Sequence, residues 1–359
     1  MRIAQVAPLW ERVPPPGYGG IELVVGLLTD ELVRRGHEVT LFASGDSITL
    51  AKLESVYPRA FRLEPSISEY SAYEALQLNR IYKQAGNFDV IHSHVGYSSL
   101  FHAGFVETPT VHTLHGAFNS DTKQVFKEAR EQPYVSISDA QREPLKELNY
   151  AATVYNGIDT ESHRFYSQPQ DPPYLAFLGR ISPEKGTHIA IEIAQKSGVP
   201  LKMAGKVDRV DVDYFESKIK PHIDGKHIEY LGEANHFEKN ALLGGAIAML
   251  FPITWREPFG LVMTESMAAG TPVLAKPMGS VPEVIANGKT GFLCDSVDDF
   301  IDAIQRLGEI DRSECRARVE RHFSVKSMVD GYLDVYQKVM RKKFEKNGYS
   351  GFLANLLMR

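Results

Sequence analysis

Hydrophobic and polar positions along the chain fall into two recurring patterns, short apolar runs and longer amphipathic segments. In the first part of the chain, apolar runs typical of buried strands occupy residues 2–7, 38–43, 90–93, 110–114, 134–137 and 152–154. Residues 21–35 and 70–85 place apolar side chains at helical spacing. Alternating strands and helices predict a parallel sheet with helices on both faces, whose ligands bind at the carboxyl ends of the strands.

The same alternation begins again after residues 159–173, a polar and proline-rich stretch that we interpret as an interdomain linker. The second set of apolar runs is 174–179, 201–204, 228–231, 246–252 and 273–275, and helical patterns cover 187–196, 261–269 and 323–339. We therefore predict an α/β protein of two Rossmann-like domains, residues 1–165 and 166–340. For the remaining tail, residues 341–359, we prefer packing on the N-terminal domain over binding to anionic lipid.

Composition narrows the class of protein but not its function. The 359 residues are 43% hydrophobic and 24% charged, which is typical of a globular protein. The net charge of −5 gives no indication of nucleic-acid binding. The two cysteines, Cys294 and Cys315, are too few for a disulfide framework, and no apolar run is long enough for a membrane span. We expect a cytoplasmic protein, with peripheral contact to the inner membrane face as the alternative.

The most informative stretch is residues 255–270, Trp-Arg-Glu-Pro-Phe-Gly-Leu-Val-Met-Thr-Glu-Ser-Met-Ala-Ala-Gly. The proline and glycine between the two acids predict that Glu257 lies on a loop and Glu265 within the helix that follows. At the start of that helix, residues 260–263 would present unpaired N–H groups and the positive end of the helix dipole, which favour a phosphate. Two acids beside an anion site suit hydroxyl-rich groups on either side, as in a nucleotide sugar. Taken alone, such a pair could also be two solvated surface acids.

Other motifs lie at predicted strand ends. Arg180 and Lys185, in the pattern G-R-x-x-x-x-K-G that begins at Gly179, are placed to clamp a diphosphate, whereas a lone cation would be surface charge. Gly19 and Gly20 precede a helix without the dinucleotide-binding pattern, so this loop is either a site of close backbone approach to a ligand or a plain tight turn.

The histidines raise the question of a metal. An H-x-H at 92 and 94 and an H-x-x-H at 112 and 115 could supply ligands, but no cysteine or acid stands at a fitting distance in the sequence. We therefore predict no metal site and interpret His92, His94 and His112 as packing residues at strand ends. Asp211 and Asp213 form a D-x-D, which we interpret as charge at a helix N-terminus.

Together these motifs resemble the E-P-F-G-L-x-x-x-E signature of retaining glycosyltransferases of family 4, which have the GT-B fold. The resemblance covers nearly the whole chain. It implies two Rossmann-like domains facing each other across a cleft, with the nucleotide-sugar donor held by the C-terminal domain and the acceptor by the N-terminal domain.

The resemblance also implies a role for each motif. In that family Arg180 and Lys185 would bind the diphosphate, Glu265 the ribose and Glu257 the transferred sugar, with His115 near the anomeric carbon. Glu22 matches an acid often found after the glycine loop. The residues expected to contact the donor are Gly19, Gly20, Gly179, Arg180, Lys185, Glu257, Phe259, Gly260, Leu261, Val262 and Glu265, and those expected to act in catalysis are His115, Glu257, Arg180 and Lys185.

The activity expected from the resemblance is transfer of a hexose with retention of configuration, without an obligatory metal or other cofactor. UDP-glucose is the favoured donor and GDP-mannose the next, and the acceptor is a hydroxyl of a saccharide or a lipid-linked saccharide. Two alternatives stay open: an epimerase or phosphorylase of the same fold, and a non-catalytic glycosyltransferase-like subunit.

Overall fold

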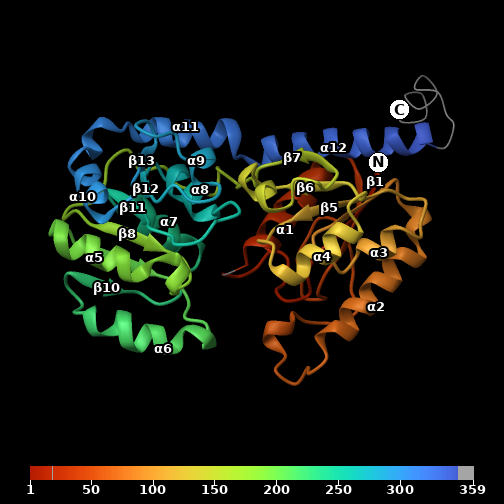
Figure 1. The fold of residues 1–359 in the computed structure, drawn as a ribbon, viewed down its shortest axis with the longest axis horizontal. Helices are drawn as coiled ribbons and strands as arrows, with labels where there is room; N and C mark the ends of the chain where they lie inside the picture. Colours follow the sequence, from red (N-terminus) through yellow and green to blue (C-terminus); the bar gives the residue numbers. More distant parts are fainter. Residues whose placement is uncertain (18, 347–359) are drawn as a thin grey trace. The chain divides into compact units, whose positions relative to one another are not determined.

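The computed structural model describes residues 1–17 and 19–346, and the chain divides into two compact units (Figure 1). Unit 1 contains Met1–Gly157 and the chain from Val325 onward, and unit 2 contains Ile158–Ser324. Each unit is built on one parallel β-sheet accompanied by helices, so the predicted α/β class is confirmed.

In unit 1 the described strands form a seven-stranded sheet in the order β3-β2-β1-β4-β5-β6-β7. All neighbours pair in parallel, because helices and loops carry the chain back between strands. The order reverses between β1 and β4, which makes the carboxyl ends of these two strands the switch point where such sheets bind ligands. The strands are β1 (Arg2–Val6), β2 (Glu38–Phe42), β3 (Lys52–Glu54), β4 (Val90–Ser93), β5 (Thr110–Leu114), β6 (Tyr134–Ser136) and β7 (Tyr150–Thr153); the helices are α1 (Gly20–Arg34), α2 (Tyr70–Lys83), α3 (Leu100–Ala103), α4 (Ser120–Glu128) and α12 (Val325–Lys346).

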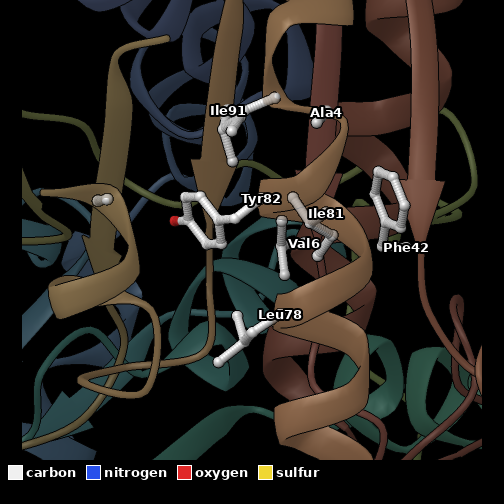
Figure 2. Packing of buried hydrophobic residues seen from close by; sticks show 9 residues of the cluster. Ala4, Val6, Phe42, Leu78, Ile81, Tyr82 and Ile91 are labelled. Carbon is white, nitrogen blue, oxygen red and sulfur yellow. The ribbon is translucent and has the colours of Figure 1, made fainter. Parts of the chain in front are cut away.

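Helix α2 shows how the periodic pattern produces the core of unit 1. Ile81 and Tyr82 follow Leu78 by three and four positions, so the three side chains share one face of the helix and pack on the sheet (Figure 2). Full burial of each such side chain contributes about 1.5–3 kcal/mol. Their partners in the sheet are Ala4 and Val6 of β1, Phe42 of β2 and Ile91 of β4.

The last described helix, α12, belongs to unit 1, although we predicted that residues up to 340 belong to the C-terminal domain. Arg35 Nη1 lies 2.5 Å from Asp330 Oδ1, and Lys338 Nζ donates to the carbonyl of Ala151 at 2.6 Å. The division of the chain therefore falls at 157/158 and 324/325 rather than at 165/166 and 340/341. An amphipathic pattern marks a helix but does not reveal which sheet its apolar face covers.

The helix also continues past the predicted start of the tail. Lys343, two residues beyond residue 341, forms an ion pair of 3.0 Å with Glu107 in unit 1. Residues 347–359, on which the rest of the tail prediction depends, lie outside the described residues. Among the helices that the structure describes, none has the length and apolar character needed to cross a membrane.

In unit 2 the described strands form a six-stranded parallel sheet in the order β10-β9-β8-β11-β12-β13. Here the order reverses between β8 and β11, so the switch point lies at their carboxyl ends. The strands are β8 (Leu175–Leu178), β9 (Leu201–Ala204), β10 (Ile228–Tyr230), β11 (Ala248–Phe251), β12 (Val273–Ala275) and β13 (Gly291–Leu293); the helices are α5 (Thr187–Ser197), α6 (Val212–Tyr214), α7 (His236–Gly245), α8 (Leu261–Ala268), α9 (Val281–Val284), α10 (Val297–Gln305) and α11 (Arg312–His322).

The predicted linker, residues 159–173, is part of unit 2 rather than a free connection. Its backbone donates hydrogen bonds into the unit, from Tyr166 N to Ala269 O at 3.0 Å and from Gln170 N to Gly245 O at 2.8 Å. Arg316 of α11 also donates to carbonyl oxygens within this stretch. The prolines exclude regular structure, as predicted, but they do not exclude docking by individual hydrogen bonds.

Candidate functional site

The predicted donor-binding residues of unit 2 lie at its switch point. Gly179 and Arg180 follow β8 directly, Lys185 lies in the turn before α5, and Glu257 is on the loop after β11. The structure places Glu265 inside α8, as the sequence indicated. Chain segments far apart in the sequence therefore meet where a ligand of a parallel α/β sheet binds.

A close approach of two backbones fixes the position of Lys185. The next residue, Gly186, has φ of 73°, and a Cβ atom on it would lie 2.0 Å from the carbonyl oxygen of Pro252. Only glycine fits there. Thr254 N also donates to the carbonyl of Glu184 at 2.9 Å, which ties the turn before α5 to the loop after β11.

This arrangement brings the Lys185 ammonium and the Glu257 carboxylate together. Lys185 Nζ lies 2.5 Å from Glu257 Oε2, and the two side chains are only 19% and 9% exposed. Trp255 Nε1 donates to the same carboxylate oxygen at 3.1 Å, and Lys185 Nζ lies 4.9 Å from the centre of the Trp255 ring. The pair is charge-compensated within a largely desolvated site, where electrostatic interactions are strong.

Two residues that sequence reasoning did not assign to the site support the Glu257 loop. A Cβ atom on Gly279 would lie 2.3 Å from Glu257 O, so the loop packs directly on this glycine. Ser280 N donates to Glu257 O at 2.9 Å, and Ser280 Oγ donates to Phe259 O at 2.9 Å. The feature of the sequence that could have indicated them is the Gly-Ser pair after the short strand β12, but such a pair by itself indicates only a turn.

Arg180 lies among acids rather than facing solvent alone. Its guanidinium contacts the carboxylate of Glu184, and Nη1 is 3.5 Å from Asp208 Oδ2. Lys206 Nζ is 2.8 Å from Asp208 Oδ1. Partial burial raises the pKa of Asp208, but the hydrogen bond from Lys206 and the nearby cations outweigh it and hold that pKa below its ordinary value. The cations of this strand end are thus matched by carboxylates.

Helix α8 begins where we predicted an anion-binding N-terminus. It begins after Gly260, which has φ of 79°, and within the described residues no side chain caps it. Met263 N donates to Gly260 O at 3.0 Å, so this amide, which we expected to be unpaired, is occupied. Leu261 and Val262 are half-buried at the helix start. Glu265 is 7% exposed and lies 3.7 Å from Lys239 Nζ, rather than beside the Lys185–Glu257 pair.

In unit 1, His115 lies after β5 in contact with a second histidine. His115 Nε2 is 2.8 Å from His94 Nδ1, and the side chain is half-buried. Burial lowers the pKa of His115 to about 4 and that of His94 well below its ordinary value of 6.5. Both imidazoles are therefore neutral at physiological pH. His92 and His112 are buried as we predicted, and both also make hydrogen bonds to other side chains.

The glycine loop of unit 1 ends at a glycine with positive φ. Gly19 has φ of 149° and is the N-cap of α1, and a Cβ atom on it would lie 2.8 Å from Pro15 Cβ. Glu22, in the first turn of α1, is buried, and desolvation raises its pKa to about 7. A buried carboxyl with a raised pKa therefore lies in the first turn of the helix that follows the glycine loop.

Among the described residues, no group of three or more histidine, cysteine, aspartate or glutamate side chains is placed to hold a metal ion. Asp211 ends a 3₁₀ turn and precedes the short helix α6, where burial raises its pKa. The D-x-D therefore lies at a helix start, as we interpreted it.

Comparison with known proteins agrees with this arrangement. The family model for glycosyl transferases group 1 matches residues 159–322, and that for Glycosyltransferase Family 4 matches residues 18–162. The N-acetyl-alpha-D-glucosaminyl L-malate synthase of Bacillus anthracis is 28% identical over 93% of this chain and 97% of that protein.

Solved structures show the same fold. AviGT4, a glycosyltransferase involved in avilamycin A biosynthesis, has a TM-score of 0.71 at 24% identity, over 94% of this chain and 98% of that one. HepE from Anabaena, in complex with UDP and glucose, has a TM-score of 0.73 at 18% identity, over 94% and 100% of the two chains. The two family models follow each other along the two Rossmann-like units, and the cations and acids of unit 2 occupy its switch point, so the chain belongs to the family 4 glycosyltransferases of the GT-B fold.

Proposed function

We propose that this glycosyltransferase moves a hexose from a nucleoside-diphosphate sugar to a hydroxyl of a saccharide or lipid-linked acceptor, with retention of configuration at the anomeric carbon. UDP-glucose is the donor we favour, with GDP-mannose next. The structures of HepE, which contain UDP and glucose or UDP-glucose, support a uridine donor by similarity.

The observation that carries the proposal is the buried pair of Lys185 and Glu257. A diphosphate that binds Lys185 replaces the carboxylate as its counter-ion, because phosphate oxygens carry more negative charge and form charge-assisted hydrogen bonds. Glu257 is then released to accept hydrogen bonds from hydroxyls of the transferred sugar. The same exchange at Arg180 displaces Glu184 and Asp208. Donor binding thus prepares both the phosphate clamp and the sugar-binding carboxylate.

The remaining parts of unit 2 fit the rest of the donor. The N-terminus of α8, at Gly260 and Leu261, offers backbone N–H groups and the positive end of the helix dipole to a phosphate. Glu265, one turn further along the same helix, is a carboxylate that suits the ribose hydroxyls. In this proposal Lys239, whose Nζ lies 3.7 Å from Glu265 Oε1, orients the carboxylate for that contact.

For the acceptor we propose unit 1, where a small pocket opens at the switch point between β1 and β4. Leu9, Leu78 and Val95 contribute apolar walls, and Gln77 and Ser98 contribute polar groups. Gln77 Nε2 donates to Ala7 O at 2.8 Å, while its buried Oε1 has no hydrogen-bond partner within the described part of the chain. An unsatisfied buried carboxamide oxygen suits an acceptor hydroxyl as its donor.

The proposed reaction breaks the bond between the anomeric carbon and the phosphate oxygen, and the electron pair leaves with the nucleoside diphosphate. Arg180 and Lys185 stabilise the charge that grows on that phosphate. The acceptor hydroxyl attacks on the face that the phosphate leaves, and its proton passes to the departing phosphate oxygen. The new glycosidic bond then has the configuration of the donor.

We further propose that no divalent metal is obligatory, because two cations of the chain, Arg180 and Lys185, would neutralise the diphosphate in the site proposed here. A reducing, cytoplasmic location is our proposal for its place in the cell. It rests on Cys294 and Cys315, which are both buried and not joined in a disulfide.

The test is a thermal-shift panel of UDP, GDP, ADP and their common sugars with EDTA present. We expect a shift of several degrees with one nucleotide family, UDP first, because a ligand that binds only the folded state stabilises it. Product analysis with saccharide acceptors then shows the linkage, and NMR of the new anomeric proton tests retention. Binding that requires added metal, or silence across the whole panel, contradicts the proposal.

Two substitutions locate the site. Lys185→Met should weaken donor binding by about 10–100-fold, because a hydrogen bond to a charged group contributes about 1.5–3 kcal/mol. The matched control is Lys196→Met in α5, whose lysine also pairs with a glutamate, Glu192, at 2.8 Å but lies exposed. Equal donor affinity in both variants would show that Lys185 does not bind the donor. Conversion of the donor without an acceptor would instead indicate an epimerase or hydrolase.

A further inference from the structure

A chain of buried polar side chains connects α12 to His115 across the core of unit 1. Tyr336 of α12 and Gln5 of β1 are completely buried, and His94 is 2% exposed. Gln5 Nε2 lies 3.0 Å from Tyr336 Oη, and Gln5 Oε1 lies 3.0 Å from His94 Nε2. His94 Nδ1 in turn lies 2.8 Å from His115 Nε2. Three hydrogen bonds therefore lead from the last described helix to the half-buried His115.

The chain continues on the other side of Tyr336. Its hydroxyl lies 2.7 Å from His92 Nδ1, and His92 Nε2 lies 2.7 Å from Thr113 Oγ1. Thr113 Oγ1 is 3.1 Å from the hydroxyl of Tyr332, one turn before Tyr336 on α12. Each of these side chains has a partner at both ends of its polar group, apart from the terminal Tyr332, as a buried network requires.

The Gln5 amide fixes the direction of these hydrogen bonds. Its Oε1 can only accept, so His94 Nε2 must carry a hydrogen. Because His94 is neutral, its Nδ1 has no hydrogen and must accept from His115 Nε2. On the other side, Gln5 Nε2 donates to Tyr336, whose hydroxyl hydrogen is then available to His92 Nδ1. With the Gln5 amide in this orientation, each hydrogen bond between Tyr336 and His115 has one donor and one acceptor.

We propose that Gln5 and His94 are positioning residues that hold His115 in the Nε2–H tautomer, so that its Nδ1 is a hydrogen-bond acceptor for a substrate hydroxyl. His115 Nδ1 makes no hydrogen bond with any residue in the described part of the chain. A ring nitrogen without hydrogen repels a phosphate oxygen but binds an O–H group. His115 therefore recognises a hydroxyl of the sugar or acceptor and takes no part in phosphate binding. This inference deepens the proposed function and rests on it for the nature of the ligand.

The arrangement exceeds what packing requires. An apolar side chain at position 5 would fill the same space without the demand that every neighbouring polar group be satisfied. A half-exposed histidine without a fixed partner would exchange between tautomers, and substrate binding would then have to select one of them. Fixing the second ring nitrogen through a hydrogen-bond partner is the way proteins choose the tautomer of a working histidine.

The first test is direct observation of the imidazole nitrogens by long-range ¹H–¹⁵N NMR of the full chain, labelled in histidine and without substrate. We expect His94 and His115 both to appear as Nε2–H tautomers, assigned by loss of their signals in His94→Phe and His115→Phe. A His115 signal from the Nδ1–H form would mean that the Gln5 amide is reversed, and the proposal would be overturned. This readout does not depend on donor binding, so its failure is distinguishable from failure of the proposed function.

The second test is Gln5→Met, which removes both amide groups but keeps a buried side chain of similar length. We expect His115 to change from one tautomer to a mixture, and turnover to fall by about tenfold or more while donor affinity stays within about twofold. The control is Tyr332→Phe, which removes a buried hydroxyl of α12 at the far end of the chain and should leave the His115 signal unchanged. An unchanged His115 signal in Gln5→Met, or an equal change in Tyr332→Phe, would overturn the proposal.

Discussion

Replacement of Glu22 by glutamine tests whether the glycine loop of unit 1 holds a carboxyl in its neutral form. Glu22 is 5% exposed at the start of α1. Loss of hydration, with a smaller contribution from the charge of Glu11, raises its pKa from an ordinary value of 4.5 to about 7. Glu11 itself is buried and lies 2.8 Å from Arg62 Nη1, so its own charge is compensated.

The sign and size of the effect follow from the two pKa values. Between pH 4.5 and about 7 the unfolded chain has lost the Glu22 proton and the folded chain has kept it, so raising the pH favours unfolding. Below this window both states are protonated, so Glu22 does not change the free energy of unfolding. Above it both states are ionised, and the folded state bears the full free-energy cost of a buried carboxylate. The difference corresponds to about 3 kcal/mol in the free energy of unfolding. Glutamine cannot ionise and carries no such cost.

The assay is urea denaturation of the wild type and Glu22→Gln between pH 4.5 and pH 8. We expect the stability of the variant relative to the wild type to rise by about 3 kcal/mol across this range. The control is Glu38→Gln, at an exposed carboxyl of β2, which should follow the wild type at every pH. Parallel pH profiles for the wild type and Glu22→Gln would show that the Glu22 carboxyl is hydrated or paired in solution, and the reasoning would fail.

Two further predictions concern unit 2. Gly186→Ala should destabilise the unit and weaken UDP binding, because a Cβ atom would lie 2.0 Å from Pro252 O and displace Lys185. The control is Gly198→Ala, where φ is also 73° but nothing lies within 4 Å of the added Cβ atom. Thermal denaturation and UDP titration of this control should show only the backbone strain of about 1 kcal/mol. Arg312→Lys should lower the melting temperature, because lysine cannot reproduce the four hydrogen bonds of the guanidinium. The control, Arg306→Lys at an exposed arginine, should leave the melting temperature unchanged. Equal melting temperatures of the two variants would contradict the structural role of Arg312.

Some elements with a clear apolar period could be predicted from the sequence, whereas helix α11, which is held by polar contacts, could not. The strand at residues 110–114 and the helix that begins near residue 70 are evident because apolar side chains recur at the required spacing. Helix α11 was missed, since its charged composition is typical of a solvated segment. In the structure Arg312 and Arg316 turn inward and donate to backbone carbonyls, and no periodic pattern records that geometry.

The candidate site shows the same limit. The sequence placed Glu257 on a loop and Glu265 in a helix, because proline and glycine mark the boundary between them. It could not reveal that Lys185 forms an ion pair with Glu257, since that contact depends on the close approach of the Gly186 backbone to the carbonyl of Pro252. Gly279 was missed for the same reason, because its role is to leave room for the backbone of Glu257.

The histidines show why a local interpretation was incomplete. His94 was interpreted as a packing residue, and its burial agrees with that, but its hydrogen bonds connect the first strand and the last described helix to His115. Gln5 lies at one end of the sequence and Tyr336 at the other, so only the folded unit 1 brings them together. Loss of α12 would leave Gln5 Nε2 and His92 Nδ1 without their partner, and buried unsatisfied groups of this kind reorganise or admit water. The C-terminal helix therefore supports the geometry of His115 although no part of it adjoins that residue in the sequence.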